Sequence, residues 1–358
     1  FLWGLNLFET HKKILLPSIR CDVEQLSEAI LELEFMKENT ILSSPKVEIM
    51  ETGNGYELFD NTGQILNAEY AKAKIISSIL AGERLIDLND GICYEEIAIT
   101  DQMQETYELW EKVDEFQDFT CNYLFGDRVE VLDSIIIADW IAKTEQGDFL
   151  LDSNGNLILK EEMVAEYIAS LASKYDTLGG KRTVQATRGD MVTIEGGTYG
   201  NQLDQKTETQ YLLNAFLQNN QADRTPVYLK SAKKQGQDDI GDTYIEIDMT
   251  QQMLYYYEEN ELILSTSVVT GNMRLKRATP ERVCYVYAKQ KNRVLRGPGY
   301  AAHVNFWMPV NGNIGIHDAK WRKEFGGEIY QTDGSHGCIN TPYDSMKILY
   351  EEVEIGTP

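Results

Sequence analysis

The chain has 358 residues, 42% of them hydrophobic, and a formal net charge of −24 at pH 7. This length exceeds one typical domain, so two or three domains are expected. The excess of 57 acidic over 33 basic residues argues against a nucleic-acid partner, because phosphates would repel such a surface.

Residues 1–118 have the pattern of an α/β module. Asp22 and Gln25 form a capping box for a helix, and Asn67 and Gly82 stand where a second helix would begin and end. Thr100 is placed to cap a third helix. The expected elements are a helix over 22–37, two strands around the Gly53-Asn54-Gly55 turn within 45–59, a helix over 68–81 and a helix from about 100 to 116.

Residues 119–228 have the pattern of a second α/β module. The best-supported helix carries Met163, Tyr167 and Leu171 on one face. The first module's order of strand, turn and capped helix recurs here with Asp204 near the cap, so the two modules look related. The expected elements are a helix over 132–144, a strand-like stretch over 148–159 that is broken at Asn154-Gly155, a helix over 161–175, a strand over 192–195 and a helix over 204–218.

The pattern changes after residue 228. Residues 229–239 are polar and lysine-rich and are predicted to be a linker. From 240 to 358 the alternation is typical of strands, and a hairpin is expected around Glu259-Asn260. Charge changes too: this part holds 12 basic and 15 acidic residues, a net of −3, which leaves −21 before it. Further strands are expected at 283–288 and 314–317, and a short helix at 343–352.

The stretch Ser335-His336-Gly337-Cys338-Ile339-Asn340 places a thiol, an imidazole and a glycine close together. A cysteine nucleophile needs a base and donors for the oxyanion that forms on attack. A second histidine, His317, precedes this stretch, and residues two apart in an extended segment share a face. The residues alone do not decide whether His317 or His336 is the base.

Two other interpretations of these residues stand beside the nucleophile. Cys338 could be a small buried apolar residue, and His317, His336 and Cys338 could form a zinc site. No Cys-x-x-Cys pair supports zinc. The sequence does not determine whether the other four cysteines pair; they are Cys21, Cys93, Cys121 and Cys284.

The stretch from Ser335 to Asn340, with His317 upstream, resembles the signature of the L,D-transpeptidase catalytic domain (YkuD-type). Asn305-Phe306-Trp307-Met308-Pro309, Ile314-Gly315-Ile316-His317-Asp318-Ala319 and Trp321-Arg322 resemble the Gram-positive subgroup, as does the tail Cys338-Ile339-Asn340-Thr341-Pro342. The departure is Thr279-Pro280-Glu281-Arg282, where the family has Thr-Pro-x-Gly. Leu178-Gly179-Gly180 and Gly196-Gly197-Thr198-Tyr199-Gly200 resemble the peptidoglycan-binding modules of such enzymes.

The resemblance implies a multidomain protein with two α+β peptidoglycan-binding modules, 1–118 and 119–228, a linker at 229–239, and a mostly-β catalytic sandwich at 240–358. It assigns Cys338 as nucleophile and His317 as proton donor and acceptor, with no cofactor or metal. His336 and Ser335 would orient this pair, and the N–H groups of Gly337 and Cys338 would stabilise the oxyanion. Tyr300, Trp321 and Asn340 would contact substrate.

The implied reaction is acyl transfer between peptidoglycan stem peptides. Cys338 would form a thioester with a tetrapeptide stem, release D-Ala and pass the acyl group to an amine, giving a 3→3 cross-link. Carbapenems would acylate the same thiol. The enzyme would act at the cell wall on the outer face of the membrane, with an anchor upstream of Phe1.

Three alternatives to the cross-linking reaction stay open. An L,D-carboxypeptidase would give the same thioester to water, and a non-catalytic wall-binding protein would keep the site without using it. The third is the zinc protein. Eight basic residues and one acid between Arg274 and Arg296 are either a solvated hairpin or a rim that attracts carboxylates.

Overall fold

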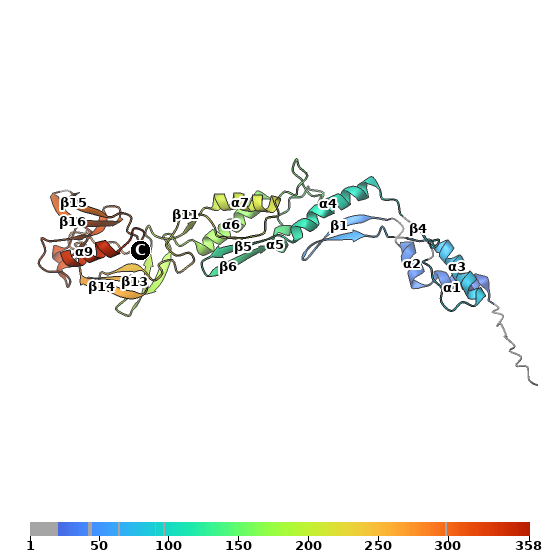
Figure 1. Cartoon of the computed structure of the whole chain (residues 1–358), viewed down its shortest axis with the longest axis horizontal. Coiled ribbons are helices and arrows are strands. Elements are labelled where there is room, and N and C mark those ends of the chain that lie inside the picture. Colours follow the sequence, from blue (N-terminus) through green and yellow to red (C-terminus); the bar gives the residue numbers. More distant parts are fainter. Residues whose placement is uncertain (1–20, 42–44, 64, 90, 96, 298) are drawn as a thin grey trace, which may run out of the picture. The chain divides into compact units, whose positions relative to one another are not determined.

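The computed structural model describes residues 21–41, 45–63, 65–89, 91–95, 97–297 and 299–358. They form two compact units, one ending at Gln117 and one running from Asp118 to Pro358 (Figure 1). The expected fold class is confirmed: mixed α/β segments precede a mostly-β C-terminal domain. Within the described ranges, every helix is too short or too polar to cross a membrane.

The first unit combines helices with a β-hairpin. The predicted hairpin and the helix capped by Asn67 are confirmed: the Asn67 side chain accepts the N–H groups of Glu69 and Tyr70, and Gly82 ends the helix at φ 76°. Thr100 caps the last helix through the N–H of Met103. The elements are α1 (Val23–Leu31), α2 (Glu34–Ile41), β1 (Val47–Thr52), β2 (Gly55–Asp60), β3 (Ile65–Leu66), α3 (Ala68–Ala81), β4 (Tyr94–Glu95) and α4 (Asp101–Gln117).

The single helix expected over 22–37 is wrong, because the chain forms α1 and α2 instead. Asp22 caps α1 as expected, accepting the N–H groups of Glu24 and Gln25. The break lets Ile30 and Met36 enter the same apolar core, while Leu33, expected on the buried stripe, is 42% exposed. Burial of both side chains therefore outweighs continuation of one helix.

The second unit begins with ten short elements. The predicted helices at 161–175 and 204–218 are confirmed as α6 and α7, and the strand at 192–195 as β8. Strand β5 lies between β6 and β10 in a three-stranded sheet. The elements are β5 (Thr120–Phe125), β6 (Arg128–Asp133), α5 (Ser134–Ala138), α6 (Glu161–Tyr175), β7 (Lys181–Gln185), β8 (Met191–Glu195), β9 (Gln202–Leu203), α7 (Gln205–Leu217), β10 (Ala222–Arg224) and β11 (Tyr228–Lys230).

The helix expected over 132–144 is wrong. Leu132 is fully buried in β6, opposite Cys121, so the apolar residue that suggested a helix belongs to a sheet. Asp133 caps α5, which ends at Ala138. Beyond it, Ile141 pairs with Leu159 in an isolated bridge. The stretch expected as a strand at 148–159 likewise forms only isolated bridges.

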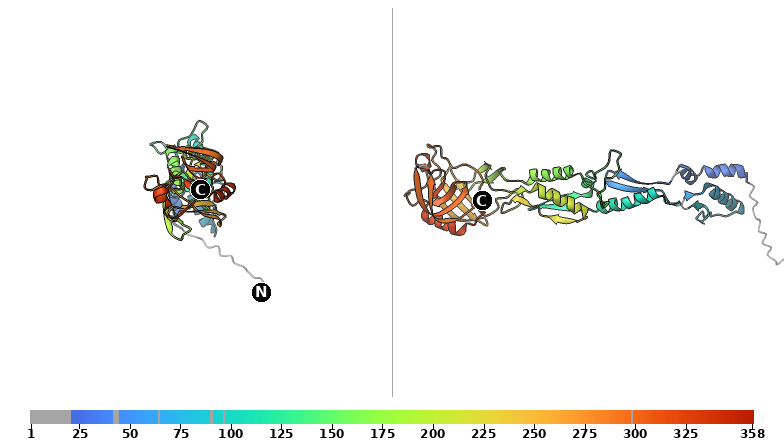
Figure 2. Two further views of the ribbon diagram at one scale, coloured as in Figure 1. Left: turned by 90° about the vertical axis from the view of Figure 1, so that its left-hand side faces the viewer. Right: turned by 90° about the horizontal axis from the view of Figure 1, so that it is seen from above.

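The C-terminal domain is built from two sheets that enclose one core. One sheet has the order β12-β13-β14 and the other the order β15-β16-β17-β18. Tyr256, Phe306, Ile316 and Leu349, from both sheets and helix α9, meet in the core. The strands of this domain are drawn mainly in orange in Figure 2. The elements are β12 (Tyr244–Asp248), β13 (Met253–Glu258), β14 (Glu261–Ser267), β15 (Gln290–Gly297), β16 (Tyr300–Asn311), β17 (Ile314–Asp318), α8 (Ile329–Asp333), β18 (Ile339–Thr341) and α9 (Tyr343–Glu352).

The strand expected at 283–288 is wrong, although its backbone groups are bonded. Val283 donates to Gly196 O and accepts from the N–H groups of Thr198 and Tyr199. Val286 N–H donates to Thr357 O, and Tyr287 N–H to Pro309 O. The segment therefore bonds to three different parts of the unit instead of lying along one neighbour.

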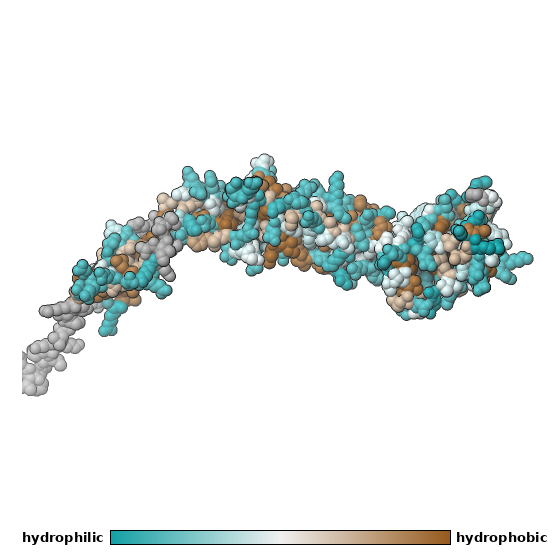
Figure 3. Space-filling model, turned by 180° about the vertical axis from the view of Figure 1, so that it is seen from behind, coloured by the Kyte–Doolittle hydropathy of each residue, from teal (hydrophilic) through white to brown (hydrophobic). Residues whose placement is uncertain are grey.

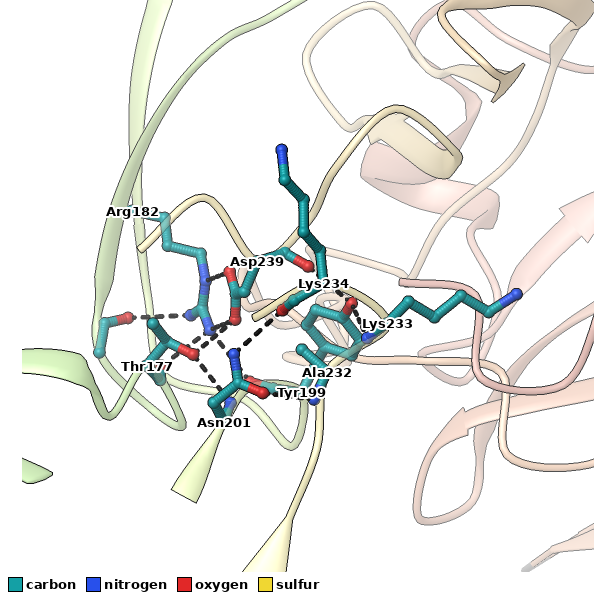
Figure 4. Close-up of polar contacts among 9 residues, drawn as sticks. Thr177, Arg182, Tyr199, Asn201, Ala232, Lys233, Lys234 and Asp239 are labelled. Carbon is teal, nitrogen blue, oxygen red and sulfur yellow. Dashed lines mark hydrogen bonds and ion pairs between the residues drawn. The ribbon is translucent and has the colours of Figure 1, made fainter. Parts of the chain in front are cut away.

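Residues 232–239 are held by a group of polar side chains that we call the clasp: Thr177, Arg182, Tyr199, Asn201 and Asp239 (Figure 4). Arg182 and Asp239 form a two-pronged ion pair, with Nε–Oδ1 at 2.8 Å and Nη2–Oδ2 at 2.7 Å. Their side chains are only 7% and 1% exposed. Thr177 Oγ1 also donates to Asp239 at 2.6 Å, and Arg182 donates to the carbonyls of Thr177 and Tyr199.

The clasp also binds backbone groups of the segment before Asp239. Asn201 accepts the N–H of Ala232 at 2.8 Å and donates to Lys234 O at 3.0 Å. The Tyr199 hydroxyl accepts from Lys233 N–H at 3.0 Å and donates to Asp239 O at 2.8 Å. Residues predicted as a linker are thus bonded at both ends.

The β7–β8 hairpin contacts the C-terminal domain directly. Thr187 donates to Glu246 through both its N–H and its hydroxyl, and Arg188 pairs with the buried Asp248 at 2.9 Å. On the face drawn in Figure 3, hydrophilic residues predominate over the C-terminal domain and apolar ones reach the surface in scattered patches.

Candidate active site

Strands β17 and β18 bring the two sequence motifs together. They run parallel, with Ile316 opposite Ile339 and His317 opposite Asn340. Because side chains alternate along a strand, the two isoleucines point into the core and His317 and Asn340 share the other face. Cys338, two residues before Asn340 and immediately before β18, continues this face.

The sulfur of Cys338 lies against backbone groups of the β16–β17 turn. The thiol is 3.6 Å from Asn313 O, and the N–H of Gly315 donates to the sulfur. A side chain at 315 would collide with Met308 O at 2.6 Å and the Trp307 ring at 2.7 Å, so glycine is required there. Gly315 was absent from the predicted site residues, because only the pairing of β17 with β18 reveals its position.

Ser335 closes the turn that presents Cys338. Its hydroxyl donates to Cys338 O at 2.6 Å and accepts the N–H of Gly337 at 3.0 Å. Gly337 has φ +116°, a conformation that side-chain-bearing residues rarely adopt. The Gly337 N–H, predicted to stabilise an oxyanion, is thus already bonded to Ser335 in this structure.

His317 is buried and held in one orientation. It is 4% exposed, its Nδ1 lies 2.9 Å from Asp318 O, and the Trp307 and Trp321 rings lie 5.8 and 5.9 Å from its own. The carbonyl can only accept, so Nδ1 carries the hydrogen and Nε2 keeps its lone pair. Burial lowers the pKa of His317, which favours the neutral imidazole that a base requires.

The environment also keeps Cys338 protonated at rest. Burial raises the pKa of the thiol, and the hydrogen bond from Gly315 opposes this rise. A neutral thiol and the neutral imidazole of His317 are thus the resting pair. The thiolate would form when the proton moves to His317, with Gly315 N–H stabilising the sulfur.

His336, the competing base, has a different environment. It is exposed, and its ring stacks on that of Tyr300 at 4.2 Å with an interplanar angle of 27°. Partial burial lowers the pKa of His336, and the charge of Arg277 lowers it further. A stacked, exposed imidazole lacks the fixed hydrogen bond that orients His317. The geometry therefore favours His317 as the base.

The residues predicted to contact substrate are placed differently. Trp321 is 51% exposed beside His317, and Tyr300 covers His336 from the end of the β15–β16 hairpin. Asn340 is 3% exposed, and its backbone N–H and C=O both bond to Val269 at 2.9 Å. Only the Asn340 carboxamide remains for a ligand. A surface aromatic and a buried amide would thus meet substrate at different depths.

A second segment, residues 270–279, supports the turn from Ser335 to Cys338, which we call the nucleophile turn. Ser335 N–H donates to Thr270 O, and Asn272 N–H donates to Ser335 O. Thr279 Oγ1 donates to Gly337 O at 2.9 Å and accepts the N–H of Gly271 at 3.0 Å. The departure from the family pattern, Arg282, follows this segment and is not among the residues with positive φ. No glycine is needed at that position.

The zinc site that His317, His336 and Cys338 could form has no counterpart among the residues with described positions. Within those ranges, no group of three His, Cys, Asp or Glu side chains is arranged to hold a metal ion. The interactions found around His317 and Cys338 are instead hydrogen bonds and aromatic contacts. The arrangement suits proton transfer to and from a nucleophilic sulfur.

Comparison with known proteins identifies the family. Residues 242–358 match L,D-transpeptidase catalytic domains, and residues 135–224 match a family described as peptidoglycan binding domains. A search of curated proteins gave no match. The chain is 31% identical to a cysteine-to-serine mutant of Enterococcus faecium L,D-transpeptidase, with a TM-score of 0.61, covering 70% of this chain and 98% of that one.

A second solved structure gives the same result. The Ldtfm–avibactam carbamoyl enzyme is 32% identical, with a TM-score of 0.61, and the match covers 70% of this chain and 96% of that one. Nearly the whole length of both relatives is therefore matched. The chain belongs to the L,D-transpeptidase family, whose members are cysteine-dependent acyltransferases.

Proposed function

We propose that the chain cross-links peptidoglycan by 3→3 L,D-transpeptidation, with Cys338 as nucleophile and His317 as base. The observation that carries this proposal is the shared face of β17 and β18, on which a buried, oriented imidazole and a thiol are presented together. Family membership supports the reaction class. The peptidoglycan-binding match at 135–224 supports the polymer as substrate.

The first half of the reaction forms a thioester. The Cys338 proton moves to His317 Nε2 as the sulfur attacks the carbonyl of the third stem residue. The oxyanion is stabilised by backbone N–H groups near the sulfur, for which we propose that of Cys338, with Gly337 joining only if it leaves Ser335 and Gly315 only if it leaves the sulfur. The C–N bond then breaks, and His317 returns the proton to the D-Ala amine, which leaves.

The second half transfers the acyl group to an acceptor stem. The acceptor amine attacks the thioester, His317 takes its proton, and the Cys338 sulfur leaves as a thiolate that is then reprotonated. Trp321 and Tyr300 would line the path of the two stems. Water in place of the amine would give the L,D-carboxypeptidase reaction, so the accessibility of the acceptor side decides between the two outcomes.

Mass spectrometry of the protein with a disaccharide-tetrapeptide tests this proposal. A dimer joined 3→3, with loss of one D-Ala, is expected, and Cys338→Ala should give neither thioester nor product. Tripeptide and D-Ala alone, even with added acceptor amine, would establish a carboxypeptidase. Turnover that survives in Cys338→Ala would contradict the cysteine mechanism.

Reaction with a carbapenem gives an independent check. The strained lactam carbonyl should acylate Cys338 in place of a stem, and peptide mapping should place one adduct on that residue. His336→Ala should retain the adduct site at a reduced rate. An adduct on any other residue would count against the assignment.

The remaining parts are proposed to place the enzyme on its polymer. We divide the chain into modules 1–118 and 119–228, which dock on peptidoglycan, a connecting segment 229–239 and the catalytic domain 240–358. The enzyme acts at the cell wall, and its position on the outer face of the membrane with an upstream anchor stays a prediction. Binding of the whole chain to insoluble sacculi, compared for Cys338→Ala with and without competing soluble glycan, would test the docking role.

A further inference from the structure

Arg277 is fixed beside the nucleophile turn by its backbone. Its N–H donates to Asn272 O at 2.9 Å. Its carbonyl oxygen lies 1.9 Å from where a Cβ on Gly271 would stand, and 3.8 Å from the equivalent point on Gly337. Only glycine at 271 allows this approach. The backbone of Arg277 therefore has a defined position beside Gly337, between His336 and Cys338 in the chain.

The side chain of Arg277 is not used by the fold. It is exposed, and within the described ranges its guanidinium forms no hydrogen bond or ion pair with the protein. Arg322, also close to the site, is by contrast bound to the carboxylate and carbonyl of Asp333. The charge of Arg277 nevertheless reaches the His336 ring. The guanidinium of Arg277, a planar cation without an anionic partner in the described residues, thus lies at the edge of the site.

The proposed substrate carries an anion close to the reacting bond. The D-Ala carboxylate of a tetrapeptide is separated from the scissile nitrogen by a single carbon, so it must lie near Cys338 whenever the scissile carbonyl does. A guanidinium binds a carboxylate with two parallel charge-assisted hydrogen bonds. Resting on the function proposed above, we propose that Arg277 binds the terminal D-Ala carboxylate of the donor stem and thereby selects tetrapeptide donors.

This contact would discriminate between stems of different length. In a pentapeptide the carboxyl group of the fourth residue is part of a peptide bond and carries no charge. Such a donor would leave the guanidinium of Arg277 without its partner at the moment of attack. The contact also ends with the reaction, because the carboxylate departs with D-Ala and vacates the acceptor side.

Paired substrates test this assignment. The kcat/KM for D-Ala release is compared with that for D-alaninamide release from the C-terminal carboxamide of the same tetrapeptide. The native chain should favour the carboxylate by about 10- to 100-fold, the range expected for a hydrogen bond to a charged group. Arg277→Gln should bring the ratio close to one, and Arg277→Lys should keep part of it.

A matched variant separates a specific contact from general charge. Arg282→Gln removes an exposed arginine from the same basic stretch and should leave the ratio at its native value. Equal loss on both substrates in Arg277→Gln, or no preference in the native chain, would overturn the assignment. Failure of the native chain to form any thioester with either substrate would instead overturn the proposed function, and this inference with it.

Discussion

The clasp and the nucleophile turn are held by similar hydrogen bonds, but the clasp stabilises the fold and the turn presents groups to a ligand. Both are irregular segments held by side chains that bond to backbone groups. In the clasp the two charges, Arg182 and Asp239, are buried against each other. Around the turn, the Cys338 thiol and the Arg277 guanidinium have no such ionic partner within the described residues. Charges that serve the fold are paired, and groups that await a ligand are left available.

This difference predicts which measurement each region controls. A buried ion pair that loses one partner leaves a charge in a medium that cannot solvate it, so the unfolding free energy falls. A catalytic group that loses its function changes the barrier to reaction while the packing around it persists. Variants in the two regions should therefore separate stability from rate.

The largest effect on the reaction rate is expected at the pair of His317 and Cys338. His317→Gln removes the proposed base but keeps a polar side chain, so the rate of Cys338 acylation should fall by about 10² to 10⁴. Stopped-flow fluorescence with a carbapenem gives this rate, and thermal unfolding serves as the stability control. A variant that acylates at the native rate would transfer the role of base to His336.

The clasp should show the reverse behaviour. Arg182→Ala leaves Asp239 buried without its cation and should lower the unfolding free energy of this unit by about 3–5 kcal/mol. Below the unfolding transition, Cys338 should still react with a carbapenem at the native rate. Denaturant unfolding followed by circular dichroism measures the loss, and exposed Arg128→Ala is the matched control.

A change at Thr279 should affect stability and acylation rate together, unlike a change at the clasp or at His317. Thr279→Val keeps the volume but removes the hydroxyl that bonds Gly337 O and Gly271 N–H. The unsatisfied groups should lower the unfolding free energy by about 1–3 kcal/mol and slow acylation together. Thr279→Ser, which keeps the hydroxyl, should restore both. A change in stability with no change in rate would mean that the tether does not position Cys338.

The smallest expected effect is a displaced pH profile. Burial holds the pKa of His317 below its ordinary value of 6.5, so the neutral base should persist as the pH falls through 6.5, and acylation should decline only at lower pH. The unfolded chain takes up this proton first, so the stability contribution is present above pH 6.5 and lost as the pH falls towards the folded pKa. A rate that already halves at 6.5 would show that His317 is not shielded.

The elements that were predicted correctly are those that begin at a capping residue or are joined by a tight turn. Asn67, Asp204 and the Glu259-Asn260 turn specify structure within a few neighbouring residues, and each was found where expected. Leu132 misled the prediction because burial in a sheet and burial in a helix leave the same apolar residue in the sequence. Its partner, Cys121, lies on the other strand of the same hairpin, whose turn at Gly126-Asp127 was the local signal that the prediction missed.

The site was predictable in its residue types but not in its bonds. The motifs around His317 and Cys338 named the residues that the pairing of β17 with β18 brings together, whereas the Gly315 N–H at the sulfur depends on strand register. The Gly337 N–H was expected to face substrate, yet Ser335 takes it. Hydrogen bonds between segments far apart in sequence, such as that from Thr279 to Gly337, have no local signature.

The clasp also fixes the number of residues between its ends. Asn201 binds Ala232 and Lys234, and Arg182 binds Asp239, so each contact depends on the spacing between 232 and 239. A true linker tolerates added or deleted residues at little cost, because closing a slightly longer loop is cheap. Here a single insertion would shift Asp239 away from Arg182. We expect natural or engineered length variation to be rejected inside this segment and accepted in the exposed turn at Gln146-Gly147, whose hydrogen bonds within the described residues go only to Thr144.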